Sequence, residues 1–238
     1  MVRGGPTQPW LPDFSQAYWR FEADWWWFTG RRHLVSRLSR KRLGSRARVL
    51  ALGCGSGING RIFAQGLDYT GVDVSLPSLK HGAAQGAGGL CLATLDYLPF
   101  ASNSFHLVLL LDVLEHLERE GPALDEAYRV LREGGEALVL SPAHMFLWGS
   151  HDIANGHKRR YSAEQLHGLL ASHGFQVEKL GYWNFSGFFA VALMRWRDRR
   201  QGLGRKPTGD FQELPHILNR LLSHVLETEN RLIAQGFC

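Results

Sequence analysis

The strongest constraint on the fold is a short apolar run, 48–52, that leads into three glycines at alternate positions, Gly53, Gly55 and Gly57. Glycine lacks a Cβ, so the backbone can turn tightly there and approach a ligand closely. An apolar segment that begins at Ile58 is typical of the start of a helix. A strand, a glycine loop and a helix in this order form a nucleotide-binding cradle of a parallel sheet. Because Ile58 stands where a dinucleotide fingerprint carries its third glycine, the loop disfavours nicotinamide oxidoreductases.

The composition indicates one globular domain with appendages. The chain has 238 residues, of which 45% are hydrophobic, and this allows a full core. Its three cysteines, Cys54, Cys91 and Cys238, are too few and too scattered for a disulfide framework or a metal cage, so we expect no metal site. The cysteine content, an N-terminus without an apolar leader, and apolar stretches well below the roughly 20 residues that cross a bilayer predict a cytoplasmic protein.

Basic residues give the chain a net charge of +5 and gather in two regions, 31–48 and 195–206. Solvated helix faces explain such groups most simply. Contact with an anionic partner is the alternative, but no nucleic-acid-binding motif accompanies the basic residues, so we expect no nucleic-acid partner. A peripheral membrane contact over 183–196, where aromatic residues meet the second basic group, is a further hypothesis.

The pattern along the chain predicts three regions. Residues 1–45 form an N-terminal helical lid segment, in which the aromatic residues from Trp25 to Phe28 either cover a cofactor cleft or pack as an ordinary amphipathic helix. Residues 46–183 alternate strand and helix, which predicts a doubly wound α/β sheet with helices on both faces. Residues 184–238 form a C-terminal helical extension that includes a helix from Leu214 to Gln235.

Within the central region, strands are expected near 47–52, 68–74, 89–93, 105–111, 135–141 and 175–183. Helices are expected near 58–65, 76–84, 122–132 and 162–173. Gly134-Gly135 is expected to stop the helix that ends at Arg132, and Gly174 to stop the helix before Phe175.

Asp73 is the second chemical feature, at the end of the run 69–74. It lies 20 positions after Gly53, the interval at which a carboxylate at the end of the second strand meets a ribose. A carboxylate accepts two hydrogen bonds, which suits paired ribose hydroxyls. The alternative is an aspartate that caps the following turn. Together with the glycine loop, the spacing favours the ribose role.

With these two features in place, the chain resembles the class I S-adenosylmethionine-dependent methyltransferases that act on small molecules, and more narrowly a largely uncharacterised subfamily of them. The narrower likeness rests on Glu22, on 26–32 and on 141–161. The resemblance implies a Rossmann-like fold, S-adenosylmethionine as cofactor and a small-molecule acceptor. The matching motifs are Val49 to Gly57, Gly71 to Ser75, Leu98-Pro99-Phe100 with Ser104-Phe105, Asp112-Val113-Leu114-Glu115-His116, and Arg129-Val130-Leu131 with Gly134-Gly135.

The resemblance also implies which residues bind the cofactor, grouped by the part of S-adenosylmethionine that each would contact. They are Gly53, Gly55 and Gly57 for the methionine part, Asp73 for the ribose, Leu95 and Asp96 for the adenine, and Leu111 and Asp112 for the sulfonium end.

Three positions depart from the family pattern. Ala51 stands where the family has an acidic residue that helps hold the cofactor's ammonium group, and His106 replaces an aspartate of the fourth strand. Thr94 stands where an aspartate meets the adenine amino group, a role that Asp96 can take if the loop shifts. Each lost charge-assisted hydrogen bond costs about 1.5–3 kcal/mol, so cofactor binding is expected to be weaker than usual.

The C-terminal extension also departs from the subfamily. There, a helix such as 214–235 leads to a final strand that inserts antiparallel beside the last parallel one, whereas only Gly236, Phe237 and Cys238 follow here. We therefore expect the final antiparallel strand to be missing, which leaves an unpaired sheet edge.

Methyl transfer requires alignment of nucleophile, methyl and sulfur, and some acceptors also need a base. The candidate bases are His144, His151 and His157, whose side chains titrate near neutral pH. We favour His157, because Asp152 is near in sequence and could orient its imidazole. His144 is expected near the end of the fifth strand, where acceptors approach in this fold.

The run Arg159-Arg160-Tyr161 predicts a clamp for an acceptor with a carboxylate or phosphate, which suggests an anionic or lipid-linked molecule. The alternative is that Tyr161-Ser162 starts the next helix, with Ser162 and Gln165 as a capping box. Two functions remain open at this point: an active methyltransferase, or a protein of the same fold that binds a ligand or partner with weak or no catalysis. Oligomeric state is not predicted.

Overall fold

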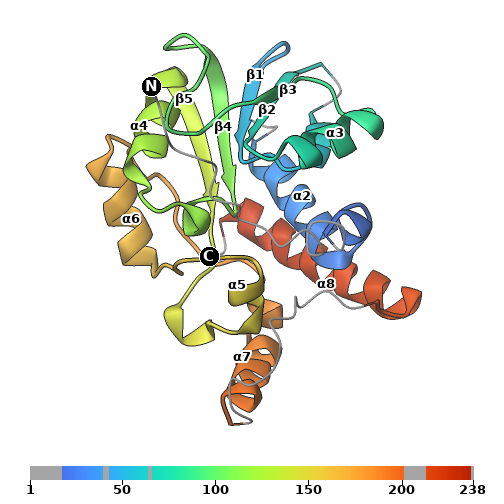
Figure 1. The fold of residues 1–238 in the computed structure, drawn as a ribbon. Coiled ribbons are helices and arrows are strands. Elements are labelled where there is room, and N and C mark those ends of the chain that lie inside the picture. Colours follow the sequence, from blue (N-terminus) through green and yellow to red (C-terminus); the bar gives the residue numbers. More distant parts are fainter. Residues whose placement is uncertain (1–17, 40–42, 64–65, 201–212, 237–238) are drawn as a thin grey trace.

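The computed structural model describes residues 18–39, 43–63, 66–200 and 213–236. Its centre is a parallel five-stranded sheet with the order β3-β2-β1-β4-β5 (Figure 1). All neighbouring strands pair in parallel. The predicted doubly wound sheet is confirmed. The strands are β1 (Arg48–Leu52), β2 (Asp68–Asp73), β3 (Leu90–Leu92), β4 (Phe105–Leu111) and β5 (Leu131–Leu140).

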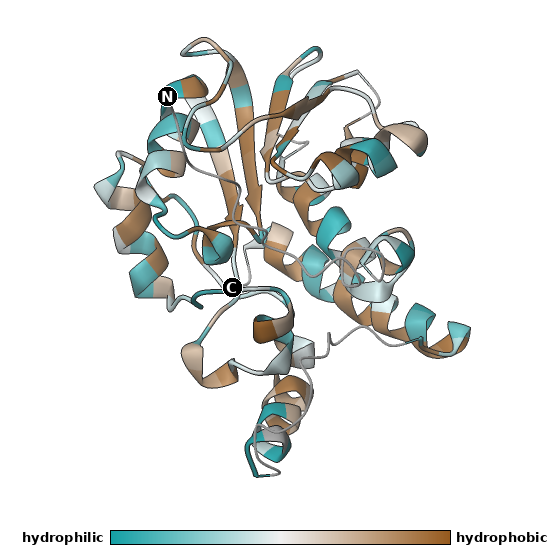
Figure 2. Cartoon of the chain, in the orientation of Figure 1, coloured by the Kyte–Doolittle hydropathy of each residue, from teal (hydrophilic) through white to brown (hydrophobic). Residues whose placement is uncertain are grey.

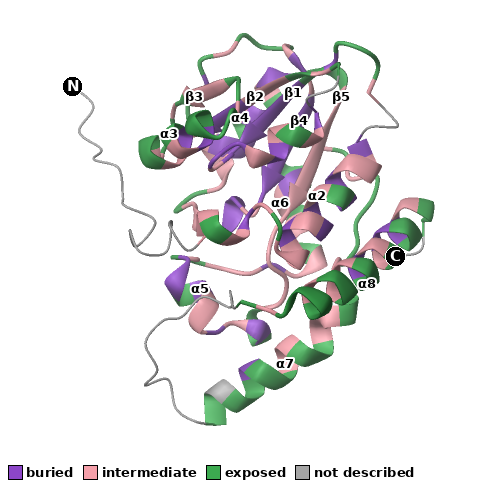
Figure 3. Ribbon diagram, turned by 90° about the vertical axis from the view of Figure 1, so that its right-hand side faces the viewer, coloured by how far each residue is buried: buried purple, intermediate pink, exposed green. Residues whose placement is uncertain are grey.

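The central strands are apolar on both faces, as expected where helices cover a parallel sheet from both sides. Alternate residues of β1 point to opposite faces, so Leu50 and Leu52 belong to one hydrophobic core and Val49 and Ala51 to the other. Hydrophobic colour and burial both concentrate on β1 and β4 (Figures 2 and 3).

Helices on the two faces complete these cores. Helices α4 (Gly121–Val130) and α6 (Ala163–Ser172) supply the core that contains Leu50. Helices α2 (Trp26–Ser39) and α3 (Leu76–Ala84), with Phe63 after the 3₁₀ helix η1 (Ile58–Ile62), supply the core that contains Val49. Helices on both faces were predicted, and this arrangement confirms them.

The predicted C-terminal helix forms as α8 (His216–Gln235) and packs on α2, so segments from opposite ends of the chain lie side by side (Figure 1). Buried Asn230 of α8 donates a hydrogen bond to the Gly30 carbonyl of α2 at 2.9 Å. A Cβ on Gly30 would stand only 2.5 Å from Leu226, so glycine permits this close approach. The aromatic segment before the second basic group forms α7 (Phe185–Arg200). In the described part of the chain, no helix combines the length and the apolar character needed to cross a membrane.

Residues 175–183 were predicted to form a strand, and this prediction is wrong: the segment has no regular secondary structure. Phe175 and Val177 still pack against the core, so the alternate apolar residues are used in packing although the segment forms no strand hydrogen bonds with β5. A strand needs a hydrogen-bonded neighbour, and in the described residues no strand lies beyond β5 to supply one.

The prediction for Gly134-Gly135 is also corrected. Helix α4 ends at Val130, and β5 starts at Leu131. The two glycines lie inside β5, where the register against β4 shifts between Phe105 and Leu107. Gly134 has a φ of 68°, so the glycines allow an irregularity within the strand instead of ending the helix. The helix predicted over 58–65 is the shorter η1, and residues 64–65 lie outside the described residues.

Several predictions concern residues outside the described ones, and they stay predictions. They involve residues 1–17 of the expected lid segment, residues 40–42 of the first basic group, residues 201–206 of the second basic group, and Phe237 and Cys238.

Candidate active site

The glycine loop after β1 adopts backbone conformations that favour glycine. Gly53, Gly55 and Gly57 have φ angles of 63°, 59° and 74°, in the left-handed region. A Cβ on Gly53 would stand 2.7 Å from Val113, whereas a Cβ on Gly55 would meet nothing within 4 Å. The loop is therefore packed at Gly53 and open at Gly55, and the open side is where a ligand can approach the backbone.

Asp73 lies at the end of β2 and holds this loop. Its Oδ2 accepts a hydrogen bond from the Gly55 N–H at 2.7 Å, and its Oδ1 accepts one from the Ser75 N–H at 2.8 Å. Burial raises the pKa of the carboxyl, against the effect of these backbone donors. The turn-capping alternative is thus present in the structure. Each carboxylate oxygen retains a second lone pair, so the ribose role is compatible with it.

The expected adenine contacts lie in the turn after β3. Leu95 is buried, and both Thr94 and Asp96 are exposed. Leu111 is buried at the end of β4, and Asp112 follows it with a φ of 56°. Since the carboxyl ends of parallel strands meet at one edge of a sheet, the glycine loop, Asp73 and Asp112 share that edge.

Arg31 is a site residue whose contact the sequence did not predict. Its side chain is only 6% exposed, and its guanidinium forms an ion pair with Asp112 and lies 4.8 Å from the centre of the Trp27 ring. It also donates a hydrogen bond of 3.3 Å to the Tyr18 hydroxyl. Burial opposes its charge, but Tyr18 and Asp112 together raise the pKa of Arg31. Helix α2 is thereby attached to the end of β4.

Glu22 brings a second carboxylate to the glycine loop. Ser56 donates a hydrogen bond to Glu22 Oε2 at 2.8 Å, and the Glu22 side chain is buried. Both residues line a pocket of about 200 Å³ together with Trp19, Ile58 and His81. The sequence carried only a weak signal for this contact, namely Glu22 as part of the subfamily likeness. The structure shows an acidic group beside the loop in spite of Ala51.

His157 and Asp152 form the pair that the sequence suggested. The His157 Nδ1 lies 2.8 Å from Asp152 Oδ1, and neither side chain is more than 7% exposed. Asp152 also accepts hydrogen bonds from Arg160, at 2.8 and 3.0 Å, and from the Gly149 N–H at 2.8 Å. Burial would raise the pKa of Asp152, but the hydrogen bonds from His157 and Arg160 hold it well below its usual range.

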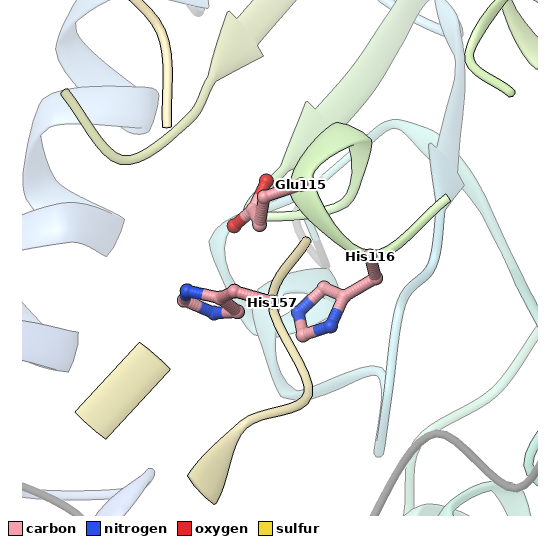
Figure 4. Close-up of side chains that lie close together, drawn as sticks. All are labelled: Glu115, His116 and His157. Carbon is pink, nitrogen blue, oxygen red and sulfur yellow. The ribbon is translucent and has the colours of Figure 1, made fainter. Parts of the chain in front are cut away.

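His157 also faces the turn that follows β4. That turn, the 3₁₀ helix η2 (Leu114–His116), carries Glu115 and His116 (Figure 4). The His116 and His157 rings meet edge to face with their centres 4.8 Å apart. The structure therefore places the favoured histidine next to two conspicuous residues of the methyltransferase-like motif.

His144 and Tyr161 lie on a neighbouring pair of chain segments. Ala143 and Tyr161 form an isolated parallel bridge, and the His144 N–H donates to the Tyr161 carbonyl at 2.9 Å. The His144 ring stacks on Phe146 and Tyr182, with centres 5.2 and 4.9 Å away. These contacts hold the His144 ring between aromatic neighbours.

The predicted anion clamp is engaged within the protein. The Tyr161 hydroxyl donates to Glu120 at 2.9 Å, and Arg159 pairs with the same carboxylate. Arg160 pairs with Asp152. Burial and the Glu120 contact raise the pKa of Tyr161. The capping-box alternative is confirmed, since the Ser162 Oγ accepts from the Gln165 N–H, and Gln165 Oε1 from the Ser162 N–H.

The structure is a Rossmann-like α/β fold with a glycine loop and Asp73 together at the carboxyl edge of its sheet. A family model described as a methyltransferase domain matches residues 50–139. A Mycolicibacterium smegmatis protein named as a probable S-adenosylmethionine-dependent methyltransferase is 30% identical over 171 residues, which are 68% of this chain and 64% of that protein. A relative from Encephalitozoon cuniculi is 33% identical and is matched over 65% of its length. The chain thus spans just under two thirds of these two relatives.

Solved structures share the fold. Phosphoethanolamine N-methyltransferase 2 from Haemonchus contortus, in complex with S-adenosylmethionine, superposes with a TM-score of 0.64 at 19% identity, covering 96% of this chain and 55% of that one. The YcgJ protein from Bacillus subtilis gives 0.59 at 18% identity, covering 73% and 82%. The chain carries a match to a methyltransferase domain, shares its fold with these structures and is similar to class I S-adenosylmethionine-dependent methyltransferases. These likenesses support S-adenosylmethionine as its cofactor.

Proposed function

We propose that this chain transfers the methyl group of S-adenosylmethionine to a small-molecule acceptor by in-line displacement. The arrangement that carries the proposal is the open glycine loop at Gly55, with the Asp73 carboxylate beside it on the carboxyl edge of the sheet. Asp73 would hold the ribose hydroxyls, and the backbone at Gly55 would pass the methionine part. When bound, the cofactor supplies an electrophilic methyl group, so the protein contributes mainly alignment.

For an acceptor that must lose a proton, we assign the base to His157. Asp152 engages its Nδ1 and so holds the tautomer and the orientation of the ring, which leaves Nε2 to accept a proton. Asp152 is itself kept ionised by Arg160 and the Gly149 N–H. His144 would stand at the acceptor side, where its aromatic neighbours limit access of water.

Isothermal titration calorimetry with S-adenosylmethionine tests the proposal. We expect the purified protein to bind the cofactor, Asp73→Ala to lose that binding, and Cys54→Ala to keep it. Because Asp73 also holds the loop, circular dichroism must show that the variant is folded, and Asp73→Asn provides a milder change. A folded wild-type protein that releases no heat at millimolar cofactor would overturn the proposal.

Among acceptors we favour lipid-linked molecules, since the arginines expected to clamp a free anion are engaged with Glu120 and Asp152. Helix α7 instead exposes Phe185, Phe189 and Trp196 ahead of a basic end. Apolar side chains beside arginines suit contact with an anionic lipid surface. A screen of labelled methyl transfer onto neutral, anionic and lipid-linked acceptors tests the substrate class, and flotation with and without anionic lipid tests the membrane contact.

A further inference from the structure

Glu115 is a carboxylate that the fold buries without completing its hydrogen bonds. Its side chain is 0% exposed. Oε2 accepts a hydrogen bond from the Ser141 hydroxyl at 2.9 Å, whereas Oε1 has no partner among the described residues. A buried polar atom left in this way costs free energy, so such an atom in a native protein calls for an explanation.

Two histidines lie beside the Glu115 carboxylate. One potential ligand atom from each of Glu115, His116 and His157 lies within 4.8 Å of the other two. Figure 4 shows Glu115 and His116 leaving the same turn toward His157. The Lys158 N–H donates to the Glu115 carbonyl at 2.7 Å, and this bond fixes the segment that carries His157 against η2. The grouping is therefore built by the fold.

The two histidines of the cluster contact neighbouring groups of the kind that hold metal-binding histidines in place. A ligating histidine usually donates its other ring N–H to a carboxylate or a backbone carbonyl. Asp152 lies against the Nδ1 of His157, so Nε2 is the ring nitrogen that stays available to a cation. The His116 ring interacts with the backbone of Asn155. Each imidazole thus has a partner in the protein besides the other members of the cluster.

We propose that Glu115, His116 and His157 bind a divalent transition-metal cation, with Zn²⁺ as the reference ion. Two imidazoles and one carboxylate form a ligand set that suits Zn²⁺ and leaves a coordination position for a further molecule. Tetrahedral Zn²⁺ with bonds of about 2.1 Å places its ligands about 3.4 Å apart, so binding draws the three side chains inward. The sequence predicted no metal site, because its three cysteines are few and scattered and the two histidines and Glu115 are not grouped by spacing alone.

The position of the site gives the cation a use in the proposed function. It lies on the turn after β4, three residues beyond Asp112, on the carboxyl edge where the methyl group is expected. A cation there would bind a hydroxyl oxygen of the acceptor and lower its pKa, with the proton passing to solvent water. In the metal-bound protein, His157 would be a metal ligand, and the cation would take over from it the activation of the acceptor hydroxyl. This role rests on the proposed function, whereas metal binding itself does not.

Metal binding is measured on the whole chain after dialysis against EDTA, by equilibrium dialysis with Zn²⁺ and elemental analysis. We expect one equivalent of Zn²⁺ in the wild type. Glu115→Gln and His157→Ala should weaken binding by more than about 100-fold, beyond the roughly 10–100-fold cost of losing an outer partner. His173→Ala is the matched control, because it removes another histidine paired with a carboxylate, Asp125, outside the site.

Co²⁺ provides a second measurement that needs no variant to fold. A tetrahedral site of nitrogen and oxygen ligands gives visible absorption bands, without the near-ultraviolet charge-transfer band of a thiolate ligand. The proposal is overturned if the folded wild type binds no Zn²⁺, if binding survives both substitutions, or if the Co²⁺ spectrum shows a cysteine ligand. Cofactor calorimetry on the same samples separates the two ideas: heat without metal binding removes only the metal site, and metal binding without heat removes only the proposed function.

Discussion

Arg31, which is buried, and Asp112, which is 21% exposed, form an ion pair that joins helix α2 to the carboxyl end of β4. The two residues are 81 positions apart. Asp112 has a positive φ and lies where the sheet opens toward the expected cofactor, so the pair ties an N-terminal helix directly to the site. Helix α2, which carries the aromatic residues before Arg31, is thereby attached to this edge of the sheet.

Replacement of Arg31 by methionine should be strongly destabilising. The variant leaves Asp112 without its partner. Because Asp112 is 21% exposed, we expect a cost between the roughly 0–1 kcal/mol of a surface pair and the roughly 3–5 kcal/mol of a fully buried one. Arg37→Met is the control on the same helix, because Arg37 pairs with Glu227 while 37% exposed, and a surface pair contributes only about 0–1 kcal/mol. Urea denaturation followed by circular dichroism gives both values. An equal loss in the free energy of unfolding for the two variants would show that the Arg31–Asp112 pair stabilises the protein no more than a surface pair does.

Glu22 should contribute to cofactor binding in place of the acid absent at Ala51. Glu22→Gln removes the negative charge beside Ser56, and loss of a charge-assisted hydrogen bond of about 1.5–3 kcal/mol should raise the Kd for S-adenosylmethionine about 10- to 150-fold. Glu213→Gln, which alters an exposed pair with Arg20, should leave the Kd unchanged. Calorimetry measures both, and an unchanged Kd in Glu22→Gln would remove Glu22 from the binding site.

Gly82 should tolerate no side chain, because α3 packs against the glycine loop at this position. A Cβ there would stand 1.8 Å from the Ser56 carbonyl oxygen, so Gly82→Ala must push the helix and the loop apart, at a cost of about 1–3 kcal/mol or more. We also expect weaker cofactor binding, since the loop moves.

Gly168→Ala is the matched control for Gly82, since Gly168 lies inside α6 and its Cβ would meet nothing within 4 Å. This variant should gain about 0.5–1 kcal/mol from helix propensity. Thermal unfolding distinguishes the two substitutions. A Gly82→Ala protein as stable as the wild type would contradict the close packing of α3 on the loop.

Glu126 should make stability depend on acid pH. Its Oε1 accepts a hydrogen bond from Arg129 Nε at 2.6 Å, and its Oε2 accepts one from the Leu98 N–H at 2.6 Å. The hydrogen bond from Arg129 is the main cause that lowers the pKa of Glu126 below 4.5. A carboxyl whose pKa is lower in the folded state stabilises the protein above its unfolded pKa, and that contribution is lost as pH falls through the folded pKa.

The corresponding test compares the wild type with Glu126→Gln by urea denaturation across the acid range. The difference in the free energy of unfolding should be largest near neutral pH and should shrink once pH falls below 4.5. A difference that is constant with pH would mean that the amide replaces the carboxylate without loss of charge-dependent stabilisation.

Local pattern accounts for most of the fold. The apolar runs of β1 and β4 and the glycines between β1 and η1 need only neighbouring residues to be recognised, because strand alternation and positive φ are local properties. The interval from Gly53 to Asp73 also places both on one edge, since parallel strands end together. The strand predicted over 175–183 was wrong because a strand depends on more than local pattern. The alternation of apolar residues is local, but a strand also needs a hydrogen-bonded neighbour, which the sequence pattern does not reveal.

The site divides in the same way. His157 and Asp152 are close in sequence, so their contact could be foreseen from spacing. Long-range packing alone brought Arg31 to Asp112, Glu22 to Ser56, and His157 to Glu115. Whether a charged side chain is exposed or pairs in the interior depends on which remote segment covers it, and burial then decides its energy because unpaired charge is costly away from water. The motif around Glu115 carried part of the resemblance to methyltransferases, whereas the Glu115 oxygen without a hydrogen-bond partner is a property of the folded chain alone.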